Sequence, residues 1–189
     1  GHMQAVGYNL YCKMLNEAVL RLRGGKNVED DDFETVADIQ TDAFIPDSYI
    51  KNEALKLDIY RRIAAVENKE EQEDMLEELI DRFGDPPTAV MNLLEITLLR
   101  GLAHSLYITE VKARPDMITF TMYEKAKIRV DKIPELLEQM GGNMTFRHAE
   151  PAQFICRLQG GRRRFSGTIL EITREVLEEM CVLREEEEK

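Results

Sequence analysis

The hydrophobic pattern of the chain changes its period near Leu106, and this change constrains the possible folds more than any other feature. Before that residue, apolar side chains recur every three or four positions, which is typical of helices that bury one face. After it, Ile118, Phe120 and Met122 alternate with polar residues, which is typical of a strand with one buried face. The sequence therefore predicts an α+β fold, in which a helical N-terminal half is packed with a ββαββα-type C-terminal half.

The helical half, residues 4–107, is predicted to contain four helices and one short strand. The first helix covers residues 7–22, and residues 35–45 form the strand. Asn52 is the expected N-cap of the second helix, because its side chain can accept a hydrogen bond from an amide of the first turn. An acidic helix covers residues 70–83, and a long helix starts at Thr88. The inner stripe of the long helix is expected to consist of Val90, Leu93, Leu94, Thr97, Leu98, Gly101, Leu102 and Leu106.

The C-terminal half, residues 108–189, is predicted to be a small mixed sheet with two helices. Strands over 108–113 and 117–123 flank a turn at residues 114–116, where Pro115 presets the backbone φ angle. A helix over 131–140 and two strands, over 144–148 and 153–158, follow. Ser166 is the expected cap of the last helix. The buried stripe of that helix is expected to contain Ile169, Ile172, Thr173, Val176, Leu177, Met180 and Leu183.

The most strongly charged element is the predicted helix in EEQEDMLEELIDRFGDPP, residues 70–87. Between residues 67 and 85, nine acidic residues oppose two basic ones. Gly84 tolerates a left-handed conformation and Pro86-Pro87 cannot continue a helix, so we expect the element to end sharply after Phe83. The acidic residues fall mostly opposite an apolar stripe that consists of Met75, Leu76, Leu79, Ile80 and Phe83.

Three interpretations of this acidic helix are open: a solvated surface, a contact to a basic partner protein, and a metal-dependent hydrolase. The hydrolase is disfavoured, because a general acid needs a desolvated carboxyl group and these carboxyl groups face outward. Glu78 and Asp81 share one side of the helix and can engage two arginines of a partner. The predicted protein-interaction residues are Glu78, Asp81, Glu77, Asp74 and Asp85.

Arg162, Arg163 and Arg164 form the one basic run of the chain, directly after Gly160-Gly161. The run is interpreted as a loop tip before the last helix, or as a contact to a phosphate or to an acidic group. Three arginines alone would bind nucleic acid weakly and with strong salt dependence. An accessory nucleic-acid contact through this loop is therefore the alternative function.

Composition narrows the classes of function. With 25 basic and 36 acidic residues, the 189-residue chain has a formal net charge of −11, which argues against a nucleic-acid binder and against an anionic membrane surface as partner. Cys12, Cys156 and Cys181 lie far apart, which indicates no disulfide framework and fits a reducing cytoplasm. His104 and His148 have no partner at the spacing of a catalytic triad or metal site. The sequence contains no P-loop or dinucleotide fingerprint, so we expect no catalysis, no metal and no cofactor.

Two short stretches near the N-terminus have simple interpretations. Gly1-His2-Met3 is typical of a cloning scar, so we expect the native chain to begin upstream. The charge run Glu29–Glu34 is interpreted as a solvated loop rather than a calcium site, because it lacks the spaced oxygen ligands and the central glycine of an EF-hand.

Four segments together resemble one known family. They are YNLYCKMLNEAV (8–19), AFIPDSYI (43–50), LDIYRRIAAV (57–66) and ELIDRFGDPP (78–87). In this order they are similar to the C-terminal domain of bacterial transcription-repair coupling factors, the Mfd family. The similarity is close over residues 4–107, and beyond them only the layout and the hydrophobic spacing match.

The resemblance implies that residues 4–189 are a non-catalytic regulatory domain of an ATP-driven DNA translocase, which removes stalled RNA polymerase and recruits nucleotide-excision repair. In the family, this domain docks on a UvrB-like N-terminal module of the same protein and so hides the surface that binds UvrA. Glu78 and Asp81 match the acidic positions that face arginines of that module. The implied partners are the UvrB-like module directly, and UvrA and RNA polymerase indirectly.

Overall fold

The computed structural model describes residues 33–185. Within them the chain forms two compact units: Thr41–Leu98, here called the helical unit, and residues 33–40 with 99–185, here called the sheet unit. The predicted helix over 7–22 and most of the charge run Glu29–Glu34 lie outside the described residues. The α+β fold class is confirmed, but the boundary between the two units falls inside a helix, at Leu98, rather than at residue 107.

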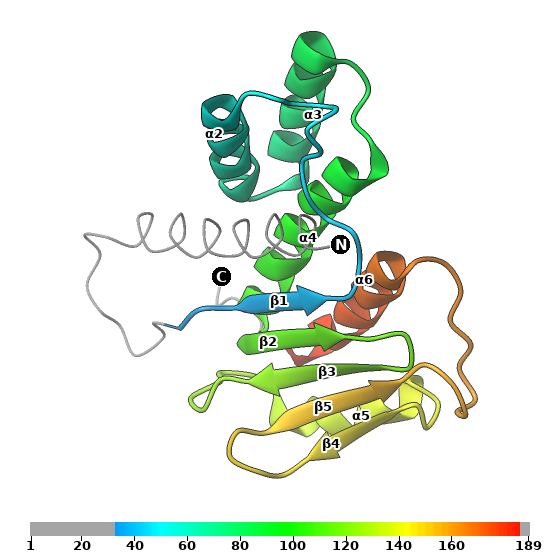
Figure 1. Cartoon of the computed structure of the whole chain (residues 1–189). Coiled ribbons are helices and arrows are strands. Elements are labelled where there is room, and N and C mark those ends of the chain that lie inside the picture. The colour runs from blue at the N-terminus through cyan, green and yellow to red at the C-terminus, as the bar shows by residue number, and fades with distance from the viewer. Residues whose placement is uncertain (1–32, 186–189) are drawn as a thin grey trace. The chain divides into compact units, whose positions relative to one another are not determined.

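The helical unit contains α2 (Glu53–Ala64), α3 (Lys69–Phe83) and the first part of α4 (Thr88–Ser105), all labelled in Figure 1. The Asn52 side chain accepts a hydrogen bond from the Leu55 amide at 3.0 Å, which confirms the predicted cap of α2. Asn68 caps α3 in the same way. α3 ends at Gly84, whose φ of 86° is a conformation that glycine adopts without strain, so the predicted stop is confirmed.

The core of the helical unit is made of aliphatic side chains from all three helices. Its fully buried members include Ile59, Ile63, Leu79, Val90 and Leu93. Burial of a side chain of this size contributes about 1.5–3 kcal/mol. Tyr60 is buried among them, and its hydroxyl accepts a hydrogen bond from the Ile45 amide at 2.8 Å, so the phenol oxygen has a partner in the core.

The apolar stripe of α3 is narrower than predicted. Met75 and Leu79 are buried and Leu76 and Phe83 are half-buried, but Ile80 is 40% exposed. Successive helical residues are separated by about 100° around the axis, so Ile80 lies beyond the margin of the face that Leu79 occupies. The placement of Ile80 in the buried stripe was therefore wrong.

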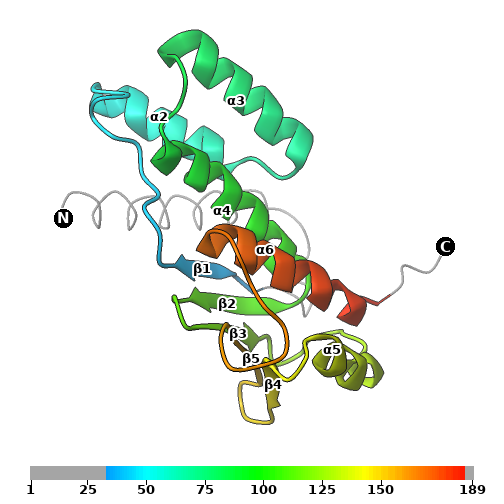
Figure 2. The same ribbon diagram turned by 90° about the vertical axis from the view of Figure 1, so that its right-hand side faces the viewer.

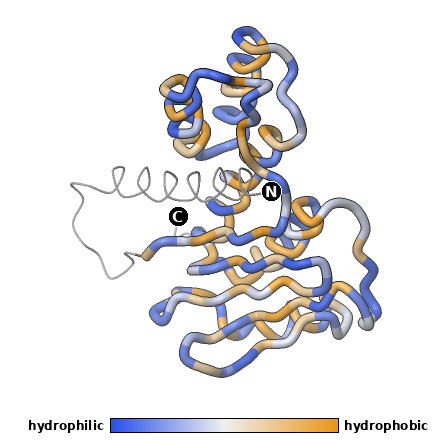
Figure 3. Tube along the Cα trace, in the orientation of Figure 1, coloured by the Kyte–Doolittle hydropathy of each residue, from blue (hydrophilic) through white to orange (hydrophobic). Residues whose placement is uncertain are grey.

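The sheet unit is built on five strands in the order β1-β2-β3-β5-β4 (Figure 1). The strands are β1 (Val36–Ile39), β2 (Ile108–Ala113), β3 (Met117–Met122), β4 (Met144–Arg147) and β5 (Gln153–Arg157). Neighbouring strands are antiparallel, except that β1 and β2 are parallel. Hydrophobic and hydrophilic residues alternate along the strands (Figure 3), as a sheet with one covered face requires.

The predicted strand over 35–45 is shorter than expected and belongs to the sheet. Its pairing ends with a 3.0 Å hydrogen bond from the Gln40 amide to the Ala113 carbonyl oxygen. The chain then enters the helical unit, where the Phe44 amide donates to the Ala89 carbonyl oxygen at 3.3 Å. A local pattern could not show this, because the parallel partner β2 follows only after three helices.

Two helices, α5 (Ile133–Gln139) and α6 (Ile169–Met180), lie on the same face of the sheet (Figure 2). A 3₁₀ turn precedes α5 at Val130–Lys132, and another follows α6 at Cys181–Leu183. Together with the strands they enclose a core whose fully buried side chains include Phe120, Leu136, Phe154, Val176 and Leu177. The predicted ββαββα layout is thus present, with β1 added at one edge.

Two predicted details of the helices are wrong. The N-cap of α6 is Thr168 rather than Ser166, because Thr168 and Glu171 form a reciprocal capping box. Along α4, the buried residues beyond Leu98 are Leu99, Arg100 and Ala103, and not Gly101 and Leu102, whereas Leu106, directly after the helix, is buried as predicted. This part of α4 belongs to the sheet unit and buries a different side of the helix.

Candidate protein-interaction surface

The candidate surface is the acidic side of α3 and the turn after it, here called the acidic face: Asp74, Glu77, Glu78, Asp81 and Asp85. Asp74, Glu78 and Asp81 follow one line along the helix because they are four and three positions apart. Glu78 is half-buried, and the other four are exposed. Within residues 33–185 none of these four forms an ion pair. The structure therefore places four of the five predicted residues on α3 and Asp85 in the turn after it, with four carboxylates open to solvent.

Arg62 of α2 fixes the orientation of Glu78. Both carboxylate oxygens of Glu78 accept hydrogen bonds from the two terminal guanidinium nitrogens of Arg62. Arg82, one turn along α3, lies 3.3 Å from the same carboxylate. The hydrogen bond from Arg62 is the main cause that lowers the pKa of Glu78 below its ordinary value, and the same bond raises the pKa of Arg62. Glu78 is therefore a fixed negative charge at neutral pH.

The sequence did not reveal this pair. Arg62 lies sixteen positions from Glu78 in the sequence and on another helix, so no local spacing connects the two. The connection between α2 and α3 comprises only residues 65–68. Such a short connection makes the two helices neighbours, and it was the one signal that Arg62 could reach α3.

An open groove of about 370 Å³ lies between α2 and α3. Its lining combines apolar side chains, chiefly Val66 and Met75, with the charged groups of Arg62, Asp74 and Glu78. An arginine or lysine combines an apolar stem with a charged end, so a basic side chain of a partner fits this lining. The groove thus favours a basic protein surface over an acidic one.

Tyr49 supports the C-terminal end of α3. Its hydroxyl lies 2.7 Å from the Gly84 carbonyl oxygen and 3.2 Å from the Leu79 carbonyl oxygen, both of which are acceptors. Its ring packs edge-on against Phe83, with ring centroids 5.8 Å apart. Burial, aided by the nearby charge of Asp85, raises the pKa of Tyr49, so the donor proton is retained at neutral pH. These contacts therefore hold the C-terminal end of the helix that carries the acidic face.

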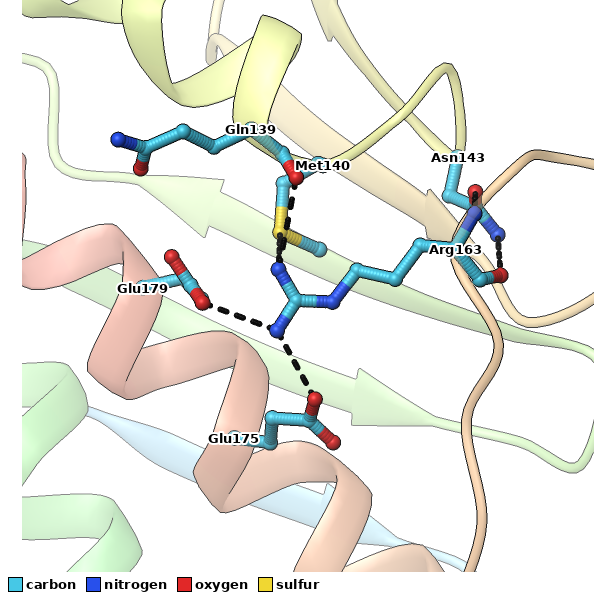
Figure 4. Close-up of polar contacts among 6 residues, drawn as sticks. All are labelled: Gln139, Met140, Asn143, Arg163, Glu175 and Glu179. Carbon is cyan, nitrogen blue, oxygen red and sulfur yellow. Dashed lines mark hydrogen bonds and ion pairs between the residues drawn. The ribbon is translucent and has the colours of Figure 1, made fainter.

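The structure separates the members of the predicted basic run. Arg162 and Arg164 are exposed, whereas Arg163 is half-buried and donates to the carboxylates of Glu175 and Glu179 at 2.9 Å each (Figure 4). An intramolecular acidic contact, one of the interpretations of this run, is thus present at Arg163. The alternative nucleic-acid contact retains only Arg162 and Arg164 of the run, and it stays a prediction.

The other candidate side chains have structural surroundings. Cys156 is buried, and desolvation raises its pKa to about 11, so its thiol is protonated and packs as a small apolar group. His104 stacks on Phe33 at 4.4 Å, and His148 packs edge-on against Phe146 at 4.5 Å. Among the residues that the structure describes, no three metal-binding side chains gather at one place, and no helix has the length and hydropathy of a membrane span.

The fold defines an α+β domain that combines an acidic helical unit with a five-stranded sheet, and comparisons with known proteins place it. The family model described as the TRCF domain matches residues 39–133. The transcription-repair-coupling factor of Staphylococcus haemolyticus (strain JCSC1435) is 36% identical over 151 residues, which are 80% of this chain and 12% of that protein. The factor of Bacillus subtilis (strain 168) is 34% identical over 143 residues, 75% of this chain and 12% of that protein.

A solved structure gives the same result. The crystal structure of the C-terminal domain of transcription-repair coupling factor covers 78% of this chain and 94% of its own, with a TM-score of 0.57 and 26% sequence identity. The chain belongs to the TRCF domain family, so the resemblance inferred from the four sequence segments is confirmed. It spans about 12% of the length of the two curated relatives.

Proposed function

We propose that this chain is the regulatory interaction domain of a transcription-repair coupling factor, and that its acidic face docks on the UvrB-like N-terminal module of the same protein. In the docked state the UvrA-binding surface of that module is covered. Release of the domain, driven by the translocase on DNA and stalled polymerase, uncovers it. The domain then serves as a reversible autoinhibitory clamp and takes no part in bond cleavage.

The observation that supports this proposal most is the fixed carboxylate of Glu78 beside the unpaired carboxylates of Asp74 and Asp81. Binding a partner's arginine is less costly in conformational entropy when the acceptor is already held in one orientation. Arg62 and Arg82 hold Glu78 without neutralising the face, because four further acids surround it. The arrangement favours a partner with several basic groups at matching spacing.

The energetics suit a releasable contact. An exposed ion pair contributes about 0.2–1 kcal/mol, whereas truncation of one partner of a pair buried in an interface costs about 2–5 kcal/mol. A few pairs of the second kind hold the module in the closed state, and a conformational change that separates them breaks them together. Such a contact weakens as ionic strength rises, since salt screens the charges at its rim.

The test is binding of this chain, added in trans, to the isolated UvrB-like module, followed by UvrA binding to the whole coupling factor. Asp81→Arg is the variant of choice, because Asp81 is exposed and its replacement breaks no ion pair of the fold. We expect it to weaken binding in trans by at least about tenfold, as loss of an interface ion pair implies, and to raise the affinity of the whole factor for UvrA.

Glu138→Arg is the matched control. Glu138 is exposed on α5 of the sheet unit, and the substitution makes the same charge change away from the acidic face. It should leave both affinities near those of the unaltered protein. Equal effects of the two substitutions, or an unchanged UvrA affinity with Asp81→Arg, would overturn the proposal.

A further inference from the structure

The loop that carries the basic run is held by contacts to Asn143 and to α6. Asn143 is 2% exposed, and its side-chain amide donates to the carbonyl oxygens of Arg157 at 2.9 Å and Arg163 at 3.2 Å. Its side-chain oxygen accepts from the Arg163 amide at 3.0 Å. A side chain at Gly161 would meet that oxygen at 1.9 Å, so only glycine fits there. One buried amide therefore fixes the path of the loop.

Arg163 attaches the same loop to α6. Besides its bonds to Glu175 and Glu179, its guanidinium lies 3.5 Å from the Gln139 carbonyl oxygen (Figure 4). The guanidinium also lies 5.7 Å from the centre of the Phe165 ring. These contacts hold the loop at Arg163, between Arg162 and Arg164. These two side chains remain exposed on a fixed backbone, a state that lowers the entropic cost of binding.

A pocket of about 460 Å³ opens beside this loop, at the end of the sheet where the turn between β2 and β3 meets the end of β5. Its apolar lining is formed by Pro115, Leu158, Phe165 and Ile172, and Arg164 stands at its polar side. Leu158 and Phe165 are only half-buried. The pocket thus offers room for one bulky apolar side chain next to a cation.

Arg164 is the charged residue among those that line the pocket, and Arg157 and Arg162 are close to lining residues in the sequence. Arg157, Arg162 and Arg164 are exposed, and the only bond that any of these three side chains makes within residues 33–185 runs from Arg164 to the Gly161 carbonyl oxygen at 2.6 Å. Asp116 is an exposed acidic residue next to the lining residue Pro115 in the sequence, and it offsets part of the positive charge. The nearby Glu171 is engaged by the Thr168 amide in the capping box. Charge complementarity therefore favours an acidic occupant.

We propose that this pocket and its arginines are a docking site for an acidic segment of a partner protein. The segment inserts one bulky apolar side chain against Leu158 and Phe165, and its carboxylates pair with Arg162 and Arg164. A protein segment is favoured over nucleic acid for two reasons. Three arginines neutralise few phosphates, and the lining offers a single aromatic ring, one face of which already has the Arg163 guanidinium over it, so successive bases have no series of rings to stack on.

The site is tested on the whole chain with a synthetic peptide in which a phenylalanine is flanked on both sides by glutamates. Binding is followed by ¹H–¹⁵N chemical shifts and by fluorescence anisotropy. We expect shifts confined to residues 114–116, 158–165 and the first turn of α6, and a loss of about tenfold or more in affinity when the phenylalanine is replaced by serine or the glutamates by glutamine.

Two variants and a control locate the site. Arg164→Glu removes the cation, Leu158→Ser removes the apolar contact, and each should weaken peptide binding by about tenfold while the remaining amide spectrum is preserved. Arg147→Glu, at an exposed position on β4, makes the same charge change outside the pocket and should have little effect. Absence of shifts at the pocket, or equal loss with all three variants, would overturn the proposal. Tighter binding of an oligothymidylate of equal charge, lost with Arg164→Glu, would overturn it in favour of nucleic acid.

Discussion

The two units of this protein differ sharply in charge. The helical unit, Thr41–Leu98, has fourteen acidic and six basic residues, a net charge of −8, whereas the described part of the sheet unit has fourteen of each and a net charge of zero. Most of the overall charge of −11 therefore comes from the helical unit. An argument from net charge about possible partners holds for the helical unit and says little about the sheet unit.

The same difference appears in how each unit uses ion pairs. In the helical unit a basic residue supports an acidic surface, because Arg62 fixes the carboxylate of Glu78 on the acidic face. In the sheet unit two acids, Glu175 and Glu179, fix Arg163 and leave its neighbours exposed. In each unit, exposed charges of one sign are held in place by ion pairs with residues of the opposite sign. The ion pairs of the two units can be tested separately.

The largest effect is expected from Leu79→Ala in the core of the helical unit. Leu79 is fully buried, so its truncation should lower the free energy of unfolding by about 2–5 kcal/mol, measured by urea denaturation. Hydrogen exchange should accelerate more over 41–98 than over 108–185. Leu76→Ala, at a half-buried position on the same helix, is the control and should cost less. Equal acceleration over both ranges would show that the units do not differ in local stability.

A smaller effect is expected from Asn143→Ala in the sheet unit. The substitution removes three hydrogen bonds to part-buried backbone groups of Arg157 and Arg163, at a cost of about 1–3 kcal/mol. Gly161→Ala should act through the same contact by displacing the Asn143 side chain. The double variant should therefore cost less than the sum of the two single variants. Strict additivity in urea denaturation would refute a shared contact.

Arg163→Gln should cost about 1 kcal/mol, since the pair it removes is partly exposed. Its larger consequence should be faster hydrogen exchange in residues 158–165, while the helical unit keeps its exchange rates. Arg174→Gln, on α6 itself, is the comparison for loss of an arginine outside the loop. If loop exchange is unchanged with Arg163→Gln, the ion pairs do not hold the loop.

The smallest effect is expected on the pH dependence of stability. Because the pKa of Glu78 is lower in the folded protein than its ordinary value of 4.5, its pair with Arg62 stabilises the fold above that value, and this contribution is lost as the pH falls through the lowered pKa. Arg62→Gln should raise the pKa of Glu78 toward 4.5, and an NMR titration of the side-chain carboxyl measures the shift. A pKa unaffected by Arg62→Gln would contradict the pair.

Local features of the fold were readable from the sequence because their causes are local. The stop at Gly84, the cap at Asn52 and the hairpin around Pro115 each depend on a few adjacent residues. The correct cap of α6 also depends on a few adjacent residues, although Ser166 was predicted in its place. Thr168 and Glu171 have the spacing of a capping box, and that signal outweighs a lone Ser166.

Features that join distant segments were not readable. The five residues of the acidic face were predicted together, because they lie on one helix and the turn directly after it. Arg62, which orients Glu78, and the two acids that hold Arg163 come from other elements. Nothing in helical or strand periodicity selects such a partner, since several charged residues at each surface have the same pattern. The parallel pairing of β1 was missed because its partner β2 follows only after three helices.

The position of β1 also has a consequence for how the chain is made. Val36 pairs with Glu110, so all of Thr41–Leu98 is an insertion within the sheet unit. During synthesis on the ribosome, β1 cannot pair with β2 until the whole insertion has emerged. The contacts among the helices of the insertion involve no strand, so they can form before that pairing. A gene truncation that deletes the residues up to Gln40 would remove β1 and leave β2 as an open, aggregation-prone edge of the sheet.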